Sequence, residues 1–157
     1  ECVRLQLSAN QISFRFGTVE LVSRLLEGRY PDYAQIIPDQ FRTTIKLPIA
    51  ELVKKVRAAS LFSTVGVNAI EIKVKSAEGV VNLSSTSAQT GEHAAELEGQ
   101  ISGEDNYILL NHRYTIDGLQ QLEGEEAVLQ MNNAETPCLL RSPQDESYLY
   151  IIMPIRQ

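Results

Sequence analysis

The sequence predicts an α+β protein with antiparallel sheets and two helices on one face. After residue 40, the order of one strand, one helix and three further strands occurs twice, which is an internal repeat. Most other segments alternate apolar and polar residues, as strands with one buried face do. Two helices are too few to cover two sheets on both sides, so we expect them together on one face of continuous antiparallel sheet.

The chain begins with three predicted strands that no helix accompanies. Apolar and polar residues alternate through residues 3–8, 11–16 and 19–25. A meander of this kind has no other element to pack its apolar face against, so it is only marginally stable by itself. We therefore interpret residues 1–33 as the last strands of a preceding domain with a junction, and residues 34–157 as a complete domain.

The junction follows the third strand and contains Gly28 and Pro31. Both residue types interrupt regular structure, and proline stiffens the chain. Tyr30 and Tyr33 flank the proline, and aromatic side chains of this kind favour packing. We expect a linker that packs against the protein.

The first repeat begins near residue 41. Its helix starts at about Pro48, because proline suits a first helical turn, and Ile49, Leu52 and Val56 follow helical spacing. Its strands are predicted at residues 41–47, 70–75, 80–85 and about 92–101.

The second repeat begins at Asn106 and has the same order. Asn111 is a favourable N-cap residue, and Gly124 stands where a helix stop is expected. Its strands are predicted at residues 107–110, 126–131, 138–141 and 148–153.

The last ten residues are unusually apolar for a chain terminus. Both faces of residues 148–153 are apolar, as in a strand that is buried on both sides. Pro154 lacks a backbone donor and should end the strand, which leaves Ile155 and Arg156 on a surface. Two interpretations stay open: a last core strand with a frayed end, or the rim of an apolar docking site.

Composition excludes several classes of protein. The chain has 157 residues, of which 43% are hydrophobic, so it can form a sizeable core, and no apolar run approaches a membrane span. Cys2 and Cys138 have no metal-ligand spacing and no signal peptide is visible, which favours a reducing, cytoplasmic location. The net charge of −6 disfavours tight electrostatic binding of nucleic acid but allows a locally basic face.

No motif indicates catalysis or a metal site. His93 and His112, the only histidines, have no cysteine or carboxylate at metal-ligand spacing. The sequence contains neither a phosphate-binding glycine loop nor a nucleophile elbow. Glu123, Glu125 and Glu126 follow a helix, where a solvated turn explains them. We expect no enzyme, no catalytic residue, no metal and no cofactor.

Two motifs resemble those of the bacterial DNA sliding clamp family, the β subunit of the replicative DNA polymerase III. Residues 26–33 (LEGRYPDY) are similar to the junction between two domains of that family, and Met153-Pro154-Ile155-Arg156 resembles its C-terminus. The repeat between the motifs extends the resemblance to the whole chain. It implies the DNA-clamp fold, with residues 1–33 as the end of the middle domain and residues 34–157 as the third domain.

The resemblance implies a role in DNA replication without catalysis. Members of the family are head-to-tail homodimeric rings that encircle double-stranded DNA without sequence preference and act as processivity factors. They dock the polymerase catalytic subunit, the clamp loader and repair proteins through a short Gln-Leu-x-Leu-Phe type peptide. A cytoplasmic location at the nucleoid, with no membrane partner, is also implied. The alternative is a free-standing β-rich domain that binds a peptide or small ligand and has no role with DNA.

The family's peptide-binding cleft maps onto the junction, the second helix and the tail. It accepts the apolar leucine and phenylalanine side chains of the partner peptide. The residues carried over by the resemblance are Pro31, Gln35, Ile36, Asn111, Tyr114, Ile151, Ile152, Met153, Pro154, Ile155 and Arg156. Ala34-Gln35 stands where basic residues can occur in the family, so the resemblance does not extend to a charged contact there.

Basic side chains of the first helix are candidates for contact with DNA. Lys54, Lys55 and Arg57 lie away from its apolar stripe. By itself this pattern fits a solvated helix face with an ion pair between Glu51 and Lys55. Under the resemblance the face lines the hole of the ring, where contacts to phosphates without base readout permit sliding. Arg113 is a fourth, weaker candidate.

A subunit contact is implied at one edge of the domain. Ser60 and Leu61, together with Ala59 before them, match the family's region that faces the other subunit, as do Glu92 and Glu96. Acidic residues on an edge strand also serve to prevent wrong strand pairing. Both interpretations stay open.

Overall fold

The computed structural model describes residues 2–30 and 32–156. The chain divides into two compact units, Glu1–Tyr33 and Ala34–Gln157. A short 3-10 turn, η1 (Tyr33–Gln35), lies at the division. In the described part of the chain, no helix is long and apolar enough to cross a membrane.

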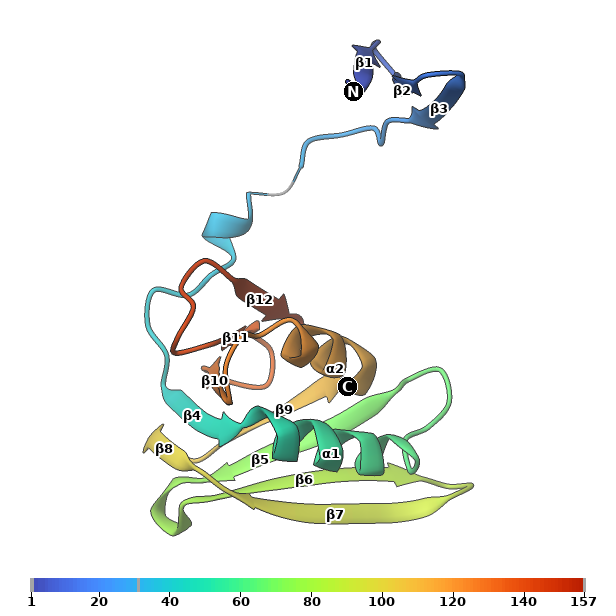
Figure 1. The fold of residues 1–157 in the computed structure, drawn as a ribbon. Coiled ribbons are helices and arrows are strands. Elements are labelled where there is room, and N and C mark those ends of the chain that lie inside the picture. The colour runs from blue at the N-terminus through green and yellow to red at the C-terminus, as the bar shows by residue number, and fades with distance from the viewer. Residues whose placement is uncertain (1, 31, 157) are drawn as a thin grey trace. The chain divides into compact units, whose positions relative to one another are not determined.

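The first unit is an antiparallel meander of the three predicted strands (Figure 1). They are β1 (Arg4–Leu7), β2 (Gln11–Phe16) and β3 (Val19–Arg24). Leu5 lies opposite Phe14 in the register, so the apolar side chains share one face of the sheet. Large apolar side chains on this unit remain exposed: Val3, Leu5, Leu7, Phe16, Val19, Leu21 and Val22.

The second unit contains the two predicted copies of one order of elements (Figure 1). The first copy comprises β4 (Thr43–Pro48), α1 (Ile49–Ser60), β5 (Ala69–Lys75), the 3-10 turn η2 (Ser76–Glu78), β6 (Val80–Ser87), β7 (Gly91–Glu98) and β8 (Gln100–Gly103). The second copy comprises β9 (Asn106–Asn111), α2 (His112–Gln120), β10 (Glu126–Met131), β11 (Cys138–Arg141) and β12 (Leu149–Ile152). The α+β class and the repeat are confirmed.

The strands of this unit form two antiparallel sheets and not the continuous sheet predicted from the sequence. Their orders are β12-β11-β10-β4-β8 and β7-β6-β5-β9. The first strand of each copy pairs in the sheet of the other copy, β4 beside β10 and β9 beside β5. Side-chain alternation does not reveal this exchange, because it reports which face of a strand is buried and not which strand lies beside it.

The long strand predicted over residues 92–101 is interrupted at Gly99. β7 pairs with β6 in one sheet, whereas β8 pairs with β4 in the other. A Cβ atom at Gly99 would lie 2.6 Å from Cδ2 of Leu47 and 3.0 Å from the Lys46 carbonyl oxygen. Glycine therefore allows the chain to pass close to β4 while it changes sheets.

The two helices pack against each other (Figure 1). α1 contacts β4, β5, β6 and β7, whereas α2 contacts β9 and β12. The large side chains that are fully buried in this core are Ile45, Leu47, Leu52, Ile70, Ile72, Leu83, Leu97, Ile108, Leu110, Leu119, Leu129 and Met131. Both copies of the repeat contribute to one core, so neither is an independent domain.

A glycine inside α2 lets the helix approach β12. A Cβ atom at Gly118 would lie 2.4 Å from Cδ1 of Tyr150. The Tyr150 ring in turn stacks on Tyr148, with ring centroids 6.4 Å apart. Glycine costs about 1 kcal/mol in a helix interior, and this contact explains why the position tolerates it.

Replacing Gly103 by alanine should destabilise the chain strongly. Its φ is 107°, and a Cβ atom would lie 1.8 Å from the Arg42 carbonyl oxygen. The left-handed backbone alone costs an L-residue roughly 1–2 kcal/mol, and the backbone clash adds to it. We expect urea unfolding to show a loss of about 3 kcal/mol or more.

Gly91→Ala is the matched control for this prediction. Gly91 has a φ of 89°, but nothing lies within 4 Å of the added Cβ atom. The expected loss is therefore only the roughly 1–2 kcal/mol of backbone strain. Equal losses in the two variants would contradict the clash at Gly103.

Candidate functional site

The C-terminal tail, residues 153–156, connects the two sheets of the second unit. Its preceding strand β12 pairs with β11, where Ile152 lies opposite Cys138. Beyond Pro154 the backbone N–H of Ile155 donates a hydrogen bond to the Leu109 carbonyl of β9, with an N–O distance of 2.8 Å. The strand ends before Pro154 as predicted, but the end is held against β9 and not frayed.

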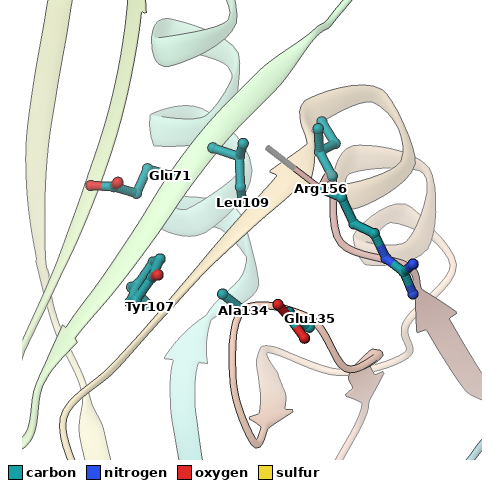
Figure 2. Close-up of a pocket in the computed structure, with 7 residues that line it drawn as sticks. Glu71, Tyr107, Leu109, Ala134, Glu135 and Arg156 are labelled. Carbon is teal, nitrogen blue, oxygen red and sulfur yellow. The ribbon is translucent and has the colours of Figure 1, made fainter.

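Two clefts lie where the tail meets β9, and together we call them the tail groove. The first has a volume of about 250 Å³ and is lined by Glu71, Tyr107, Leu109, Ala134, Glu135, Ile155 and Arg156 (Figure 2). The second has a volume of about 390 Å³ and is lined by Val67, Ala69, Glu71, Ser84, Ser85, Thr86, Leu109, Ile155 and Arg156. They share Glu71, Leu109, Ile155 and Arg156, so the end of the tail borders both clefts.

The apolar side chains of the tail and of the strand before it differ in their exposure to solvent. Ile152 is 2% exposed and belongs to the core, whereas Met153 is 55% exposed. Ile151, Pro154 and Ile155 are half-buried. The tail can therefore offer apolar surface to a ligand while β12 stays fixed in the core.

Asn111 and Tyr114 come from the start of α2. The Asn111 side-chain oxygen accepts a hydrogen bond from the Arg113 backbone N–H at 2.9 Å, which confirms the predicted N-cap. Asn111 also lies opposite Ala69 in the pairing of β9 with β5, beside the second cleft. The Tyr114 side chain is 57% exposed.

The side chains of Tyr150 and His112 are uncharged at neutral pH. Burial raises the pKa of Tyr150 above its ordinary value, and the negative charge of Asp117 raises it further. Tyr148 and Tyr114 add smaller contributions to the same pKa, which indicates that Tyr114 lies near the Tyr150 ring. Burial likewise lowers the pKa of His112 at the first turn of α2. Both side chains therefore stay neutral there.

Two of the predicted cleft residues from the junction, Gln35 and Ile36, do not line the tail groove. Gln35 ends η1 and is exposed, and Ile36 is 40% exposed. Within the described part of the chain, neither side chain lines the two clefts. Pro31 lies outside the described residues.

The predicted basic face of the helix pair has no internal counterions. Lys54, Arg57 and Arg113 are exposed, and Lys55 is half-buried. Across residues 2–30 and 32–156, none of the four forms an ion pair, and the expected pair between Glu51 and Lys55 is absent. Their charges are therefore available to an external anion.

The structure brings the predicted subunit-contact residues to one edge. β7 is the edge strand of its sheet, and Glu92 and Glu96 are exposed on it. Leu61 follows α1 and is 72% exposed. Phe62 stacks on His93 of β7 with ring centroids 5.3 Å apart, so the end of α1 stays beside this strand.

Two residues of this edge are less accessible. Ser60 is half-buried, and its hydroxyl donates to the Arg57 carbonyl at 2.7 Å. Ala59 is fully buried, and its carbonyl accepts a hydrogen bond from the Ser85 hydroxyl. The accessible part of the edge is therefore Leu61 with the two glutamates.

Sequence reasoning missed Glu71, Tyr107 and Glu135 as lining residues of the tail groove. The alternating patterns of β5 and β9 place Glu71 and Tyr107 on the outward face, because the isoleucines next to them along each strand are buried. The pattern does not indicate that β5 pairs with β9, and this pairing brings the two strands together beside the tail. Among the described residues, no group of three or more His, Cys, Asp or Glu side chains could hold a metal ion.

Several known proteins are similar to the chain. A family model described as "DNA polymerase III beta subunit, C-terminal domain" matches residues 34–156. The beta sliding clamp of Bacillus subtilis (strain 168) is 34% identical over 158 residues, which cover 99% of this chain and 42% of that protein. The chain thus spans about two fifths of the length of the curated relatives it matches.

Solved structures show the same similarity. The crystal structure of the DNA polymerase sliding clamp from Bacillus subtilis matches with a TM-score of 0.81 and 32% identity, covering 99% of this chain and 41% of that one. The DnaN sliding clamp from Bartonella birtlesii bound to griselimycin matches with a TM-score of 0.84 and 27% identity, with the same coverage of 99% and 41%.

Cys138 should not react with a thiol reagent in the folded chain. It is fully buried, and burial raises the pKa of its thiol, so almost no thiolate forms at about pH 8. In a Cys2→Ser variant we expect DTNB to modify Cys138 only after urea is added. In the converse Cys138→Ser variant, the exposed Cys2 should react at once. Rapid modification of Cys138 without urea would contradict its burial on β11, beside β12.

Proposed function

Because the chain belongs to the DNA polymerase III beta subunit family, we propose that it is part of a ring-shaped DNA sliding clamp that confers processivity on the replicative polymerase without catalysing a reaction. Residues 34–157 form its third domain, and residues 1–33 form the last strands of the middle domain with the junction. The exposed apolar face of the β1–β3 meander supports this assignment, because a complete domain would bury such a face.

Partner docking is assigned to the tail. The observation that carries it is the apolar tail held against β9, with a cleft on each side of Ile155. The occupant is a Gln-Leu-x-Leu-Phe type peptide of the polymerase catalytic subunit, the clamp loader or repair proteins. The Met153 thioether and the branched side chain of Ile155 provide surface that adapts to different partners. The Bartonella birtlesii relative was solved with griselimycin bound, which supports a ligand-binding role.

The proposed docking site keeps the residues predicted from the start of α2 and the tail, whereas Gln35 and Ile36 line neither cleft. Leu109 of β9 is added, because it borders both clefts. Ile152 supports the rim from the core and does not contact the peptide, since it is 2% exposed.

Duplex DNA is assigned to the helix pair. Lys54, Lys55 and Arg57 on α1 and Arg113 on α2 have no internal counterion among the described residues. Contacts from such side chains to phosphates carry no sequence information, so a ring that encircles DNA can slide. The net charge of −6 limits the affinity of the chain alone. Binding of DNA places the protein at the nucleoid in the bacterial cytoplasm.

The β7 edge is assigned to the second subunit of a head-to-tail homodimer. An edge strand offers unpaired backbone groups, and Leu61 adds an exposed apolar side chain beside them. Glu92 and Glu96 provide charge along the same strand, and Ser60 contributes through its accessible part.

A synthetic Gln-Leu-x-Leu-Phe peptide should bind the chain with a Kd between about 10 µM and 1 mM. Burial of its leucine and phenylalanine contributes about 3–6 kcal/mol before ordering losses, and backbone contacts add to this. Deleting residues 154–157 should abolish binding in calorimetry, because it removes Ile155 and Arg156 from both clefts. The fold should persist in circular dichroism, since β12 ends at Ile152.

The double variant Lys54→Gln/Lys55→Gln serves as control for the peptide experiment. Both lysines lie on α1 and line neither cleft of the tail groove. Peptide affinity should therefore be unchanged. If peptide-induced chemical shift changes map to the helices and spare the tail, the docking assignment is wrong.

Removing cations from the helix pair should weaken binding to duplex DNA. We expect the chain to bind a labelled duplex weakly, without sequence preference and with strong loss as salt rises. Lys54→Gln/Lys55→Gln/Arg57→Gln should reduce the slope of log affinity against log salt by about 2–3, as measured by fluorescence anisotropy.

A single-charge comparison controls for nonspecific electrostatics. Lys54→Gln should weaken binding more than Lys73→Gln, which removes a cation from the outward face of β5. Equal effects of the two variants, or a clear preference among duplex sequences, would overturn the assignment of DNA to the helices.

A further inference from the structure

We infer that the tail groove selects partner segments that carry a lysine or arginine beside their apolar residues. This inference rests on the proposed docking of a peptide at the tail, and it specifies the chemistry of that peptide. The carboxylates of Glu71 and Glu135 in the groove are the residues that make the selection.

Glu71 occupies the central position in the groove. It lines both clefts and is half-buried on β5, where it lies opposite Leu109 of β9 and Ser84 of β6. The Ser84 hydroxyl donates to its carboxylate at 3.5 Å, which is a long and weak hydrogen bond. Within residues 2–30 and 32–156, Glu71 forms no ion pair. A half-buried carboxylate without a cation gains more from an external one than a fully solvated carboxylate does.

Glu135 adds a second carboxylate at the other end of the first cleft. It lies in the turn between β10 and β11, where its backbone N–H donates to the Asn133 side-chain oxygen at 2.9 Å. This hydrogen bond fixes the turn while the side chain stays exposed. Glu135 also forms no ion pair in the described part of the chain.

The basic residues near the groove do not neutralise these carboxylates. Arg156 lines both clefts, but Figure 2 shows its guanidinium group directed away from Glu71. Lys73 lies two residues from Glu71 on the same outward face of β5, opposite Tyr107. Neither cation forms an ion pair with a carboxylate among the described residues.

The apolar lining completes the fit to a basic side chain. Leu109 and Ile155 can cover the aliphatic stem of a lysine or arginine while its charged end reaches Glu71. Tyr107 is 55% exposed at the same cleft and offers an aromatic ring to the cation. A glutamate at that place in the partner meets two carboxylates and is disfavoured.

The test compares peptides that differ by one charge. Gln-Leu-Ser-Leu-Phe peptides extended at either end by Gly-Lys, Gly-Gln or Gly-Glu are titrated into the chain at low salt, with Kd measured by calorimetry or NMR. We expect one lysine peptide to bind about three- to tenfold more tightly than its glutamine counterpart, and the glutamate peptide to bind more weakly still. Raising the salt concentration should shrink this difference.

Variants of the groove assign the effect to the carboxylates. Glu71→Gln/Glu135→Gln should reduce the affinity ratio of lysine to glutamine peptide to near one. Glu98→Gln removes a carboxylate from the exposed side of β7, outside both clefts, and should preserve the ratio. Circular dichroism confirms that each variant is folded.

The outcomes separate the two proposals. If peptides bind but the lysine, glutamine and glutamate forms have equal affinity, the charge selection is wrong and the docking site stands. A ratio that persists in the double variant also overturns the role of Glu71 and Glu135. If no peptide binds the chain but DNA does, the docking assignment fails together with this inference.

Discussion

The pairing of β9 with β5 determines where the tail groove and α2 lie in the second unit. It runs from Ala69 opposite Asn111 to Val74 opposite Asn106, and it joins the second copy of the repeat to the sheet of the first. α2 starts directly after β9, so the pairing also places α2 against α1. Leu109, in the middle of β9, carries the carbonyl that holds the tail. The pairing of β4 with β10 joins the copies in the other sheet, but only the pairing of β9 with β5 brings Leu109 and the start of α2 beside β5.

The exchange of first strands between the two copies leaves two kinds of charged surface on one small domain, the outward face of β5 and the helices. Inward side chains of β5, such as Ile70, Ile72 and Val74, enter the core, while the outward residues Glu71 and Lys73 remain accessible. The helices carry cations that form no ion pair within the described residues, whereas the chain as a whole has a net charge of −6. The cations proposed to contact phosphate and the carboxylates proposed to contact a basic peptide therefore lie on different elements. Because these elements share one rigid core, the two proposed ligands need not compete for the same side chains.

Much of the fold follows from the sequence, because its strands and helices have strong local patterns. The N-cap Asn111 and the strand end before Pro154 come directly from backbone chemistry. The division of the strands into two sheets could not be predicted, because the alternation of apolar and polar residues does not indicate which strands are neighbours. The break at Gly99 could not be predicted for a similar reason, since apolar and polar residues continue to alternate across it. The tail residues came from a resemblance, whereas Glu71 and Glu135 needed three-dimensional adjacency that no short motif encodes.

The way in which the tail is held fits the proposal that it docks several partners. β12 is fixed by its pairing with β11 and by the contact of Tyr150 with Gly118. Beyond Ile152, the backbone hydrogen bond from Ile155 to Leu109 and the burial of half-covered side chains are what anchor the tail. Such a segment opens at a smaller free-energy cost than the strands that position it. The groove can therefore adjust its width to different apolar side chains, while the carboxylate of Glu71, on the central strand β5, keeps its place. In the proposed site, shape tolerance and charge selection reside in different parts, a division that lets a binding site accept many partners and still reject most sequences.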